Sequence, residues 1–179
     1  DLLRHACKDT GRQFARAIIM PNLKNSIKTV EQAEKYYQDI KQYTDYSNFE
    51  PLMTLFFTDA LNEDEIKKVG DSKVIHGIKL YPSGVTTNSK DGVEAIDKCF
   101  NLFELMQKYE VPLLIHAETN EKDIDIFDRE KFFIDRHLNQ IHKDFPELKI
   151  VFEHISTKEA VDFVISSSSN VGATITPQH

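Results

Sequence analysis

The sequence of 179 residues is poor in the features that mark several classes of protein. Its only cysteines, Cys7 and Cys99, lie far apart without the close spacing of a metal-binding or redox pair, which excludes a disulfide framework. We expect both to be packing residues in a reducing, cytoplasmic compartment. The apolar runs are no longer than a strand, which excludes a membrane-spanning helix and a membrane partner.

A basic surface is also missing. Lys and Arg number 22 against 29 Asp and Glu, and the net charge of −7 argues against a nucleic-acid partner. No glycine-rich phosphate-binding pattern follows a strand-like segment, which counts against a nucleotide-binding sheet. With 40% hydrophobic and 28% charged residues, the composition is that of a globular protein. We expect a single catalytic domain covering residues 1–179.

What the sequence does contain is six short apolar runs rich in strand-forming residues. Most are continuous rather than alternating, which is typical of strands that are covered on both faces in a parallel sheet. The six runs are Arg16–Pro21, Pro51–Thr58, Val74–Pro82, Pro112–Glu118, Lys149–His154 and Val171–Pro177.

Segments with helix-start chemistry separate these runs. Each has a residue that can cap a helix N-terminus, followed three residues later by Glu or Gln, which is the pattern of a capping box. The third segment continues as an amphipathic stretch over Val93–Tyr109. This alternation predicts right-handed βαβ units and a parallel sheet. The four pairs are Thr29 with Gln32, Asn62 with Glu65, Asp91 with Glu94, and Ser156 with Glu159.

Polar residues recur where the predicted strands end, and this favours a (β/α)8 barrel over an open sheet. A barrel builds its active site at the carboxyl ends of its strands. Six strands are two short of closure, so the predicted fold class is α/β, an incomplete TIM barrel. The strand-end residues are Asn22, Asp59, Lys79, Tyr81, His116, His154, Gln178 and His179.

Lys79, His116 and His154 have the chemistry to hold metal. Closing the sheet would aim all three at a common centre, and neutral imidazoles are zinc ligands. A neutral lysine amine that takes up carbon dioxide becomes a carbamate, a carboxylate able to bridge two cations. Two other interpretations stay open at this point. Lys79 could extend from the barrel mouth to solvent, and each histidine could be a hydrogen-bonded core residue.

Seven segments carry a family resemblance: RAIIMPN, PLMTLFFTD, KLYPSGVTTNS, PLLIHAE, DIDIFDRE, VFEHIST and ATITPQH. In order and approximate spacing they resemble the dihydroorotases of the monofunctional type, in the amidohydrolase superfamily. The resemblance covers about Arg16 to His179, nearly the whole chain. The KLYP run with its Thr-Thr-Asn loop, and DIDIFDRE, distinguish this group from hydantoinases. The family fold is the (β/α)8 barrel, and the six runs would be its strands two to seven.

The resemblance also implies a metal centre. Dihydroorotases hold two zinc ions bridged by a carboxylated lysine, and that lysine matches Lys79 in KLYP. The later histidine ligands match His116 in LLIHAE and His154 in VFEHIS. His179 matches no ligand of the family.

The substrate-binding residues follow from the same resemblance. Asn22 matches the asparagine that holds the substrate carboxylate, and Thr86 and Thr87 match threonines on a loop that closes over bound substrate. The implied activity is that of a hydrolase of pyrimidine biosynthesis, the reversible cyclisation of N-carbamoyl-L-aspartate to dihydroorotate. The implied partner is this small molecule, and a homodimer is the assembly to be tested.

The sequence departs from the family at both ends. The family's first strand carries a His-x-His metal pair and a nearby arginine, and its eighth strand carries an aspartate that acts as general acid and base. Neither segment is found within residues 1–179. We therefore expect no catalytic acid or base in this chain and no activity from it alone. Two alternatives remain: a related cyclic-amide hydrolase such as a dihydropyrimidinase, or an inert dihydroorotase-like assembly domain.

Overall fold

The computed structural model describes residues 2–44 and 48–179, which form a parallel sheet flanked by helices. The strands lie side by side in the order of the sequence, so that each pairs with the next strand along the chain. Each predicted apolar run coincides with one of them, although β2 begins one residue before its run, at Glu50, and the strand prediction is confirmed. The strands are β1 (Arg16–Ile19), β2 (Glu50–Phe56), β3 (Ile75–Leu80), β4 (Leu113–Ile115), β5 (Ile150–Phe152) and β6 (Val171–Ala173).

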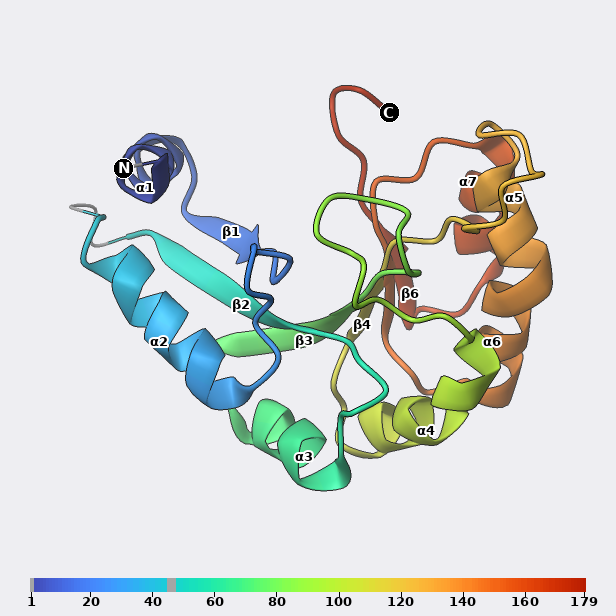
Figure 1. The fold of residues 1–179 in the computed structure, drawn as a ribbon, viewed down its shortest axis with the longest axis horizontal. Helices are drawn as coiled ribbons and strands as arrows, with labels where there is room; N and C mark the ends of the chain where they lie inside the picture. The colour runs from blue at the N-terminus through green and yellow to red at the C-terminus, as the bar shows by residue number, and fades with distance from the viewer. Residues whose placement is uncertain (1, 45–47) are drawn as a thin grey trace.

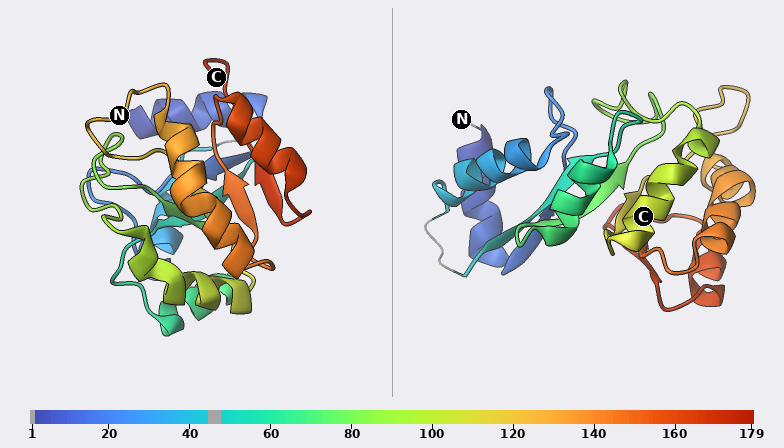
Figure 2. Two further views of the ribbon diagram at one scale, coloured as in Figure 1. Left: turned by 90° about the vertical axis from the view of Figure 1, so that its right-hand side faces the viewer. Right: turned by 90° about the horizontal axis from the view of Figure 1, so that it is seen from below.

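The helices lie along the outer side of the curved sheet, where those from α2 to α7 follow one another in an arc (Figure 1). A second orientation shows the segment from α5 to α6 beside α7 (Figure 2). The helices are α1 (Leu2–Gln13), α2 (Val30–Lys41), α3 (Glu63–Asp71), the 3₁₀ turn η1 (Ile96–Cys99), α4 (Phe100–Lys108), α5 (Arg129–Phe133), the π-helical η2 (Ile134–Leu138), α6 (Asn139–Asp144) and α7 (Lys158–Ser166).

A curved parallel sheet with helices outside it is the arrangement of a partial (β/α)8 barrel, which confirms the predicted α/β fold class. Among the described residues, β1 and β6 each have a paired strand on one side only. Ile18 in β1 is 44% exposed, and Ile175, which follows β6, is 73% exposed. Apolar side chains are therefore open to solvent at both edges of the sheet.

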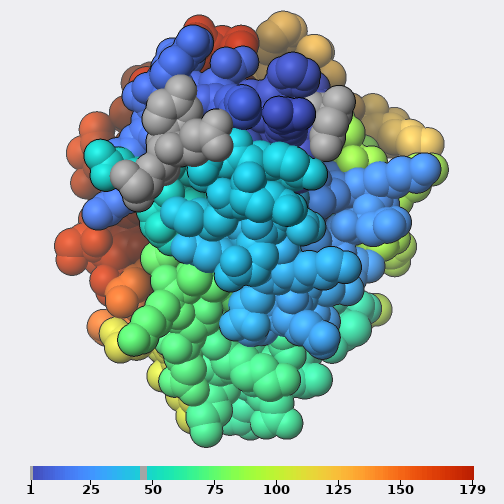
Figure 3. All heavy atoms as spheres, turned by 90° about the vertical axis from the view of Figure 1, so that its left-hand side faces the viewer, coloured from blue at the N-terminus to red at the C-terminus, as the bar shows by residue number. Residues whose placement is uncertain are grey.

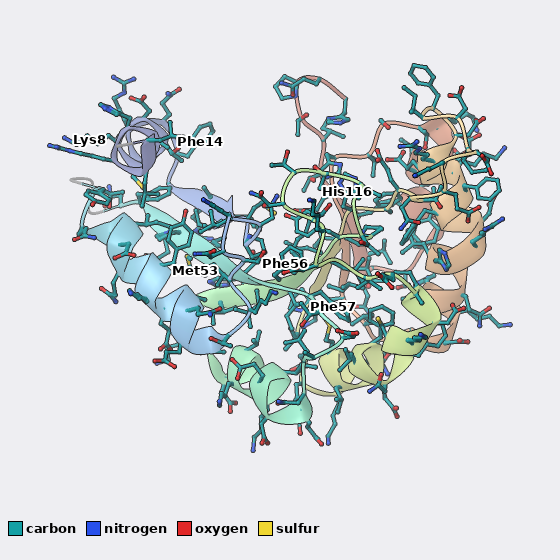
Figure 4. The ribbon with its side chains drawn as sticks, in the orientation of Figure 1. Lys8, Phe14, Met53, Phe56, Phe57 and His116 are labelled. Carbon is teal, nitrogen blue, oxygen red and sulfur yellow. The ribbon has the colours of Figure 1, made fainter. Side chains whose placement is uncertain are left out.

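Successive residues of a strand point to opposite faces of the sheet, and this separates the helix-facing core from the inner face. Phe57 points to the helices, where its ring centroid lies 5.6 Å from that of Phe103 in α4. Phe56 points the other way and lies 5.2 Å from the ring of Tyr81 (Figure 4). Lys79 pairs in register with Phe56. It therefore belongs to the inner face and not to the helix-facing core.

One of the four predicted capping boxes forms in full, and a second forms in part. Thr29 Oγ1 accepts a hydrogen bond from the backbone N–H of Gln32, and the Gln32 side chain accepts one from the N–H of Thr29, which completes a capping box for α2. Asn62 Oδ1 accepts from the N–H of Glu65 at the start of α3. The Glu65 carboxylate accepts instead from the N–H of Val30, and this contact joins α3 to α2.

The other two predicted caps are wrong. Asp91 does not start a helix at Val93, because the helical turn begins only at Ile96 and has no side-chain cap. Asp91 pairs instead with Lys28 at 2.8 Å. Ser156 is replaced as the cap of α7 by the next residue, Thr157, whose Oγ1 accepts from the N–H of Ala160.

The two cysteines are buried and unbridged, as predicted. Cys7 lies on the side of α1 that packs on α2, and Figure 3 shows these helices one above the other. Burial raises the pKa of both thiols, that of Cys99 to about 11. Of the helices in the described part of the chain, none combines the length and apolar character needed to cross a membrane.

Candidate functional site

A cavity of about 500 Å³ opens at the carboxyl ends of the strands. Five of the six predicted site residues line it: Asn22, Lys79, Thr86, His116 and His154. They come from four different strand ends and the loop that follows β3, because the carboxyl ends of parallel strands meet at one edge of a sheet. The sixth, Thr87, lies on the same loop but does not line the cavity.

Lys79 is the most deeply placed of these residues, with only 1% of its surface exposed. The interpretation that its side chain extends to solvent is therefore wrong. Its Nζ lies 2.5 Å from Oε2 of Glu153, which is also buried. Burial lowers the pKa of the Lys79 amine, and the Glu153 carboxylate partly opposes this. The net pKa is lowered, so the Lys79 amine loses its proton more readily than the amine of an exposed lysine does.

His116 and His154 are in direct contact, with Nδ1 of His116 2.9 Å from Nε2 of His154. The backbone of His154 is left-handed, with φ of 44°, which is uncommon for a residue with a side chain. Its N–H donates to Thr174 Oγ1 at the end of β6. Burial, followed by the charges of His116 and Lys79, lowers the pKa of His154 to about 4. This ring is therefore neutral at pH 7, as a metal ligand must be.

Glu118 and Glu153 belong to the same site, although sequence reasoning did not select them. Glu118 Oε2 lies 3.2 Å from His116 Nε2, and the neighbouring His116 ring lowers the pKa of the carboxyl against the effect of burial. The sequence held a signal for Glu118 only, because it follows His116 by two residues, the spacing that keeps side chains on one side of an extended chain.

Further residues complete the cavity wall. Burial and the charge of Glu153 raise the pKa of the Tyr81 phenol, so its hydroxyl stays protonated. His179, for which the sequence suggested no role, stacks against His154 with ring centroids 5.5 Å apart. Met20, Thr174 and Thr176 also line the wall. By contrast, Asp59, one of the polar residues at the strand ends, lines a separate hollow near Cys99.

Asn22 connects the site to the loop after β3. Its Nδ2 donates to the backbone carbonyl of Thr87 at 3.0 Å, and Asn88 Nδ2 donates back to the carbonyl of Asn22 at 2.9 Å. Within the loop, Ser89 Oγ donates to the Thr86 carbonyl at 2.7 Å and accepts from the Thr86 N–H. These bonds hold the Thr86 side chain at the cavity.

The donor atoms of the site fit a metal ion. Lys79 Nζ and His116 Nε2 are buried, and each has a carboxylate oxygen beside it, that of Glu153 at 2.5 Å and that of Glu118 at 3.2 Å. Two nitrogen ligands of one tetrahedral zinc ion lie about 3.3 Å apart, close to the 2.9 Å between the two imidazoles. Within residues 2–44 and 48–179, no three His, Cys, Asp or Glu side chains form such a group. The fit therefore depends on Lys79 together with the two histidines.

The model of the amidohydrolase family matches residues 2–178. The chain belongs to the amidohydrolase family. Among curated relatives, this amidohydrolase chain is 50% identical over 178 residues to the dihydroorotase of Stutzerimonas stutzeri, a match that covers 99% of the chain and 51% of the relative. The chain thus spans about half the length of the curated relatives it matches.

Solved structures agree. The amidohydrolase chain superposes on the dihydroorotase of Campylobacter jejuni with a TM-score of 0.90 and 38% identity, covering 99% of this chain and 51% of that one. It also superposes on the dihydroorotase of Saccharomyces cerevisiae, solved in complex with 5-fluoroorotic acid. The TM-score is 0.84 and the identity 29%, and the match covers 98% of this chain and 51% of that one. These similarities support the family resemblance seen in the motifs.

Proposed function

We propose that the natural protein carrying this sequence is a zinc-dependent dihydroorotase. It catalyses the reversible cyclisation of N-carbamoyl-L-aspartate to dihydroorotate, a step of de novo pyrimidine biosynthesis. One observation supports this above the others: Lys79, His116 and His154 line a single cavity in a chain 50% identical to a dihydroorotase. Residues 1–179 then act as one part of a barrel-shaped catalytic domain.

Lys79, His116 and His154 would hold the metal. We assign Lys79 as a carbamate that bridges two zinc ions, because its buried amine has a lowered pKa and only a neutral amine reacts with carbon dioxide. The neutral ring of His154 and the adjacent ring of His116 offer nitrogen donors. Bound zinc supplies Lewis-acid polarisation of a carbonyl oxygen and lowers the pKa of water.

The other residues of the cavity position the substrate. The substrate carboxylate is assigned to Asn22, whose side-chain amide is a hydrogen-bond donor at the cavity wall. Thr86 and Thr87 are assigned to a loop that excludes water when substrate is bound. Asn22 already bonds to this loop through the Thr87 carbonyl, so substrate binding and loop position are coupled through one side chain.

Around the metal ligands, two carboxylates control charge. Glu118 is ionised at neutral pH because its pKa is lowered beside His116, and it orients that ring. Glu153 balances the charge of Lys79 whenever the amine is protonated. We place this activity in the cytoplasm, without a nucleic-acid or membrane partner, and we propose a homodimer as the assembly.

The experiment that tests this proposal is a substrate assay of the purified natural protein with zinc analysis. We expect turnover of dihydroorotate and of N-carbamoyl-L-aspartate, two zinc ions per subunit, and little turnover of dihydrouracil. The 179-residue chain alone should be inactive. Preference for dihydrouracil would instead identify a dihydropyrimidinase, and an inactive natural protein without zinc would identify an assembly domain.

A further inference from the structure

The segment DIDIFDRE, Asp123–Glu130, is one of the segments that carry the family resemblance, but none of its residues lines the cavity. Most of it is exposed loop, and it ends where α5 begins at Arg129. Its last residue, Glu130, is only 5% exposed although it carries a carboxylate. A carboxylate is seldom buried without partners, and those of Glu130 indicate what this segment does.

Glu130 binds the turn that follows His154. Its Oε1 accepts hydrogen bonds from the N–H of Ser156 at 3.1 Å, from the N–H of Thr157 at 2.8 Å and from Thr157 Oγ1 at 2.6 Å. Its Oε2 lies 3.2 Å from the same Ser156 N–H. One buried carboxylate thus accepts hydrogen bonds from three donors at the N-terminus of α7.

The opposite side of this turn is held by β6. The N–H of His154 donates to Thr174 Oγ1 at 2.9 Å, and the N–H of Ile155 donates to the Thr174 carbonyl at 3.0 Å. His154 itself has φ of 44°, a conformation that persists in a residue with a side chain only where its surroundings enforce it. Thr174 contacts this residue directly, and Glu130 contacts Ser156 and Thr157 on the other side of the turn.

The first turn of α5 also contacts the segment that follows the other histidine. The carbonyl of Arg129 accepts from the N–H of Thr119 at 3.3 Å, and Thr119 lies three residues after His116. Two adjacent residues, Arg129 and Glu130, are therefore bonded to the segments that carry His116 and His154. The 2.9 Å contact between the two rings depends on the relative placement of those segments.

We propose that Glu130 is a positioning residue that fixes the imidazole of His154 against that of His116. The simpler interpretation is that Glu130 only stabilises α7 as a helix cap, as Asn62 stabilises α3. The two differ in one respect. A cap alone sets the stability of a helix, whereas a positioning residue also sets the geometry of the two rings. The role of those rings in metal binding rests on the proposed function, but their placement does not.

The test uses the natural protein, metal-free and labelled with ¹⁵N-histidine. Glu130→Met keeps the length of the side chain but removes both acceptor oxygens, and Glu130→Gln keeps one of them. Asn62→Ala is the matched control, because it removes a helix cap remote from the cavity. We expect the hydrogen-bonded imidazole N–H shared by His116 and His154 to lose its protected, downfield resonance in Glu130→Met. Glu130→Gln and Asn62→Ala should keep it.

A second measurement is the affinity for Co²⁺, followed by its visible absorption. Residues that orient metal-ligating side chains typically contribute about 10–100-fold to metal affinity. We therefore expect Glu130→Met to weaken Co²⁺ binding at least about tenfold. Asn62→Ala should leave it unchanged. A Glu130→Met protein that keeps both the imidazole resonance and the control's Co²⁺ affinity would overturn the proposal.

Two further outcomes are distinguishable. If wild-type protein binds no Co²⁺ but Glu130→Met still loses the imidazole resonance, the positioning role stands and the metal site of the proposed function falls. If Glu130→Met does not fold, Glu130→Asp keeps the carboxylate but shortens the side chain, which withdraws it from the N–H groups of Ser156 and Thr157 and leaves the Thr157 cap of α7 in place. Loss of the resonance in Glu130→Asp would support the proposal. An unchanged resonance in Glu130→Asp would overturn it.

Discussion

His116 and His154 follow neighbouring strands, and Nδ1 of the first lies 2.9 Å from Nε2 of the second. Two facing imidazole nitrogens at this distance share one proton when both rings are neutral, because one must donate and the other accept. Adding a second proton between them would charge one of the rings and set two N–H groups against each other within a half-buried cavity. The pair is therefore sensitive to acid.

Stability should fall on mild acidification of the metal-free protein. The pKa of His154 is about 4 in the folded chain against an ordinary value of 6.5, so unfolding takes up a proton between these values. The free energy of unfolding should decrease as pH falls from 6.5 to about 4, and this contribution should be fully lost below pH 4. Denaturant titrations across this range measure it.

His154→Asn is the informative variant, since asparagine tolerates the left-handed backbone at this position. It should flatten the pH dependence between 6.5 and 4. The exposed His76 provides a control, and His76→Gln should keep the wild-type slope. Identical slopes in His154→Asn and the wild-type protein would contradict the expectation.

Removing one member of the buried pair of Lys79 and Glu153 should be costly. Lys79→Met leaves the Glu153 carboxylate buried without its partner, for which a loss of about 3–5 kcal/mol in the free energy of unfolding is typical. The double variant Lys79→Met, Glu153→Gln should recover most of it. Chemical denaturation measures both, and Lys158→Met, which breaks an exposed pair with Asp162, should have little effect.

Activity separates the carbamate from a simple cation at Lys79. In the natural protein, Lys79→Arg should lose bridged metal and most turnover, because a guanidinium stays charged and cannot form a carbamate. Lys79→Ala should behave likewise but regain part of its turnover when a small carboxylic acid is added. Normal zinc content and normal turnover in Lys79→Arg would rule out the carbamate.

The two threonines of the loop after β3 should not be equivalent. Thr86 lines the cavity, whereas Thr87 contacts Asn22 only through its backbone carbonyl, which an alanine keeps. Thr86→Ala should therefore lower kcat more than Thr87→Ala, with zinc content unchanged in both. Steady-state kinetics with metal analysis checks this. Wild-type kinetics in the double variant would show that the loop is an ordinary surface turn.

A methyl group at Gly92 should displace the same loop. A Cβ built there would lie 2.4 Å from the Tyr81 carbonyl oxygen and 2.8 Å from that of Ser89. Both are backbone atoms, so relieving the overlap requires the backbone itself to move. Gly92→Ala should cost about 1–3 kcal/mol, as overpacking usually does. Gly172→Ala is the matched control, because nothing lies within 4 Å of its Cβ. Thermal denaturation of both variants decides whether the close approach matters.

The strands were predictable because their signal is local and strong. A run such as PLLIHAE is apolar at every position that a doubly covered strand buries, and no alternative pairing competes with it. The caps at Thr29 and Asn62 were predictable for the same reason, since each binds an N–H three residues ahead. The caps expected at Asp91 and Ser156 did not form, and both residues instead contact a residue distant in sequence, Lys28 for the Asp91 carboxylate and Glu130 for the Ser156 N–H.

The site was predictable only in part. Histidine and lysine at strand ends are conspicuous, so Lys79, His116 and His154 could be named from the sequence and the family resemblance. Glu153 could not, because its role comes from its position opposite Lys79 across the curved sheet, 74 residues away in a strand that is not a neighbour. Acidic residues are common, and only the fold shows which of them lies beside a buried lysine.

The strand order has a consequence for how this chain is made. Because each strand from β2 to β6 pairs with the one before it, no strand after β1 has to wait for a later segment before it can add to the sheet. The sheet can grow from its N-terminal side as the polypeptide leaves the ribosome, one strand and helix at a time. The cavity is then among the last features to form, because it needs His154 and β6. Most of the sheet of the nascent chain is therefore in place before the cavity is complete.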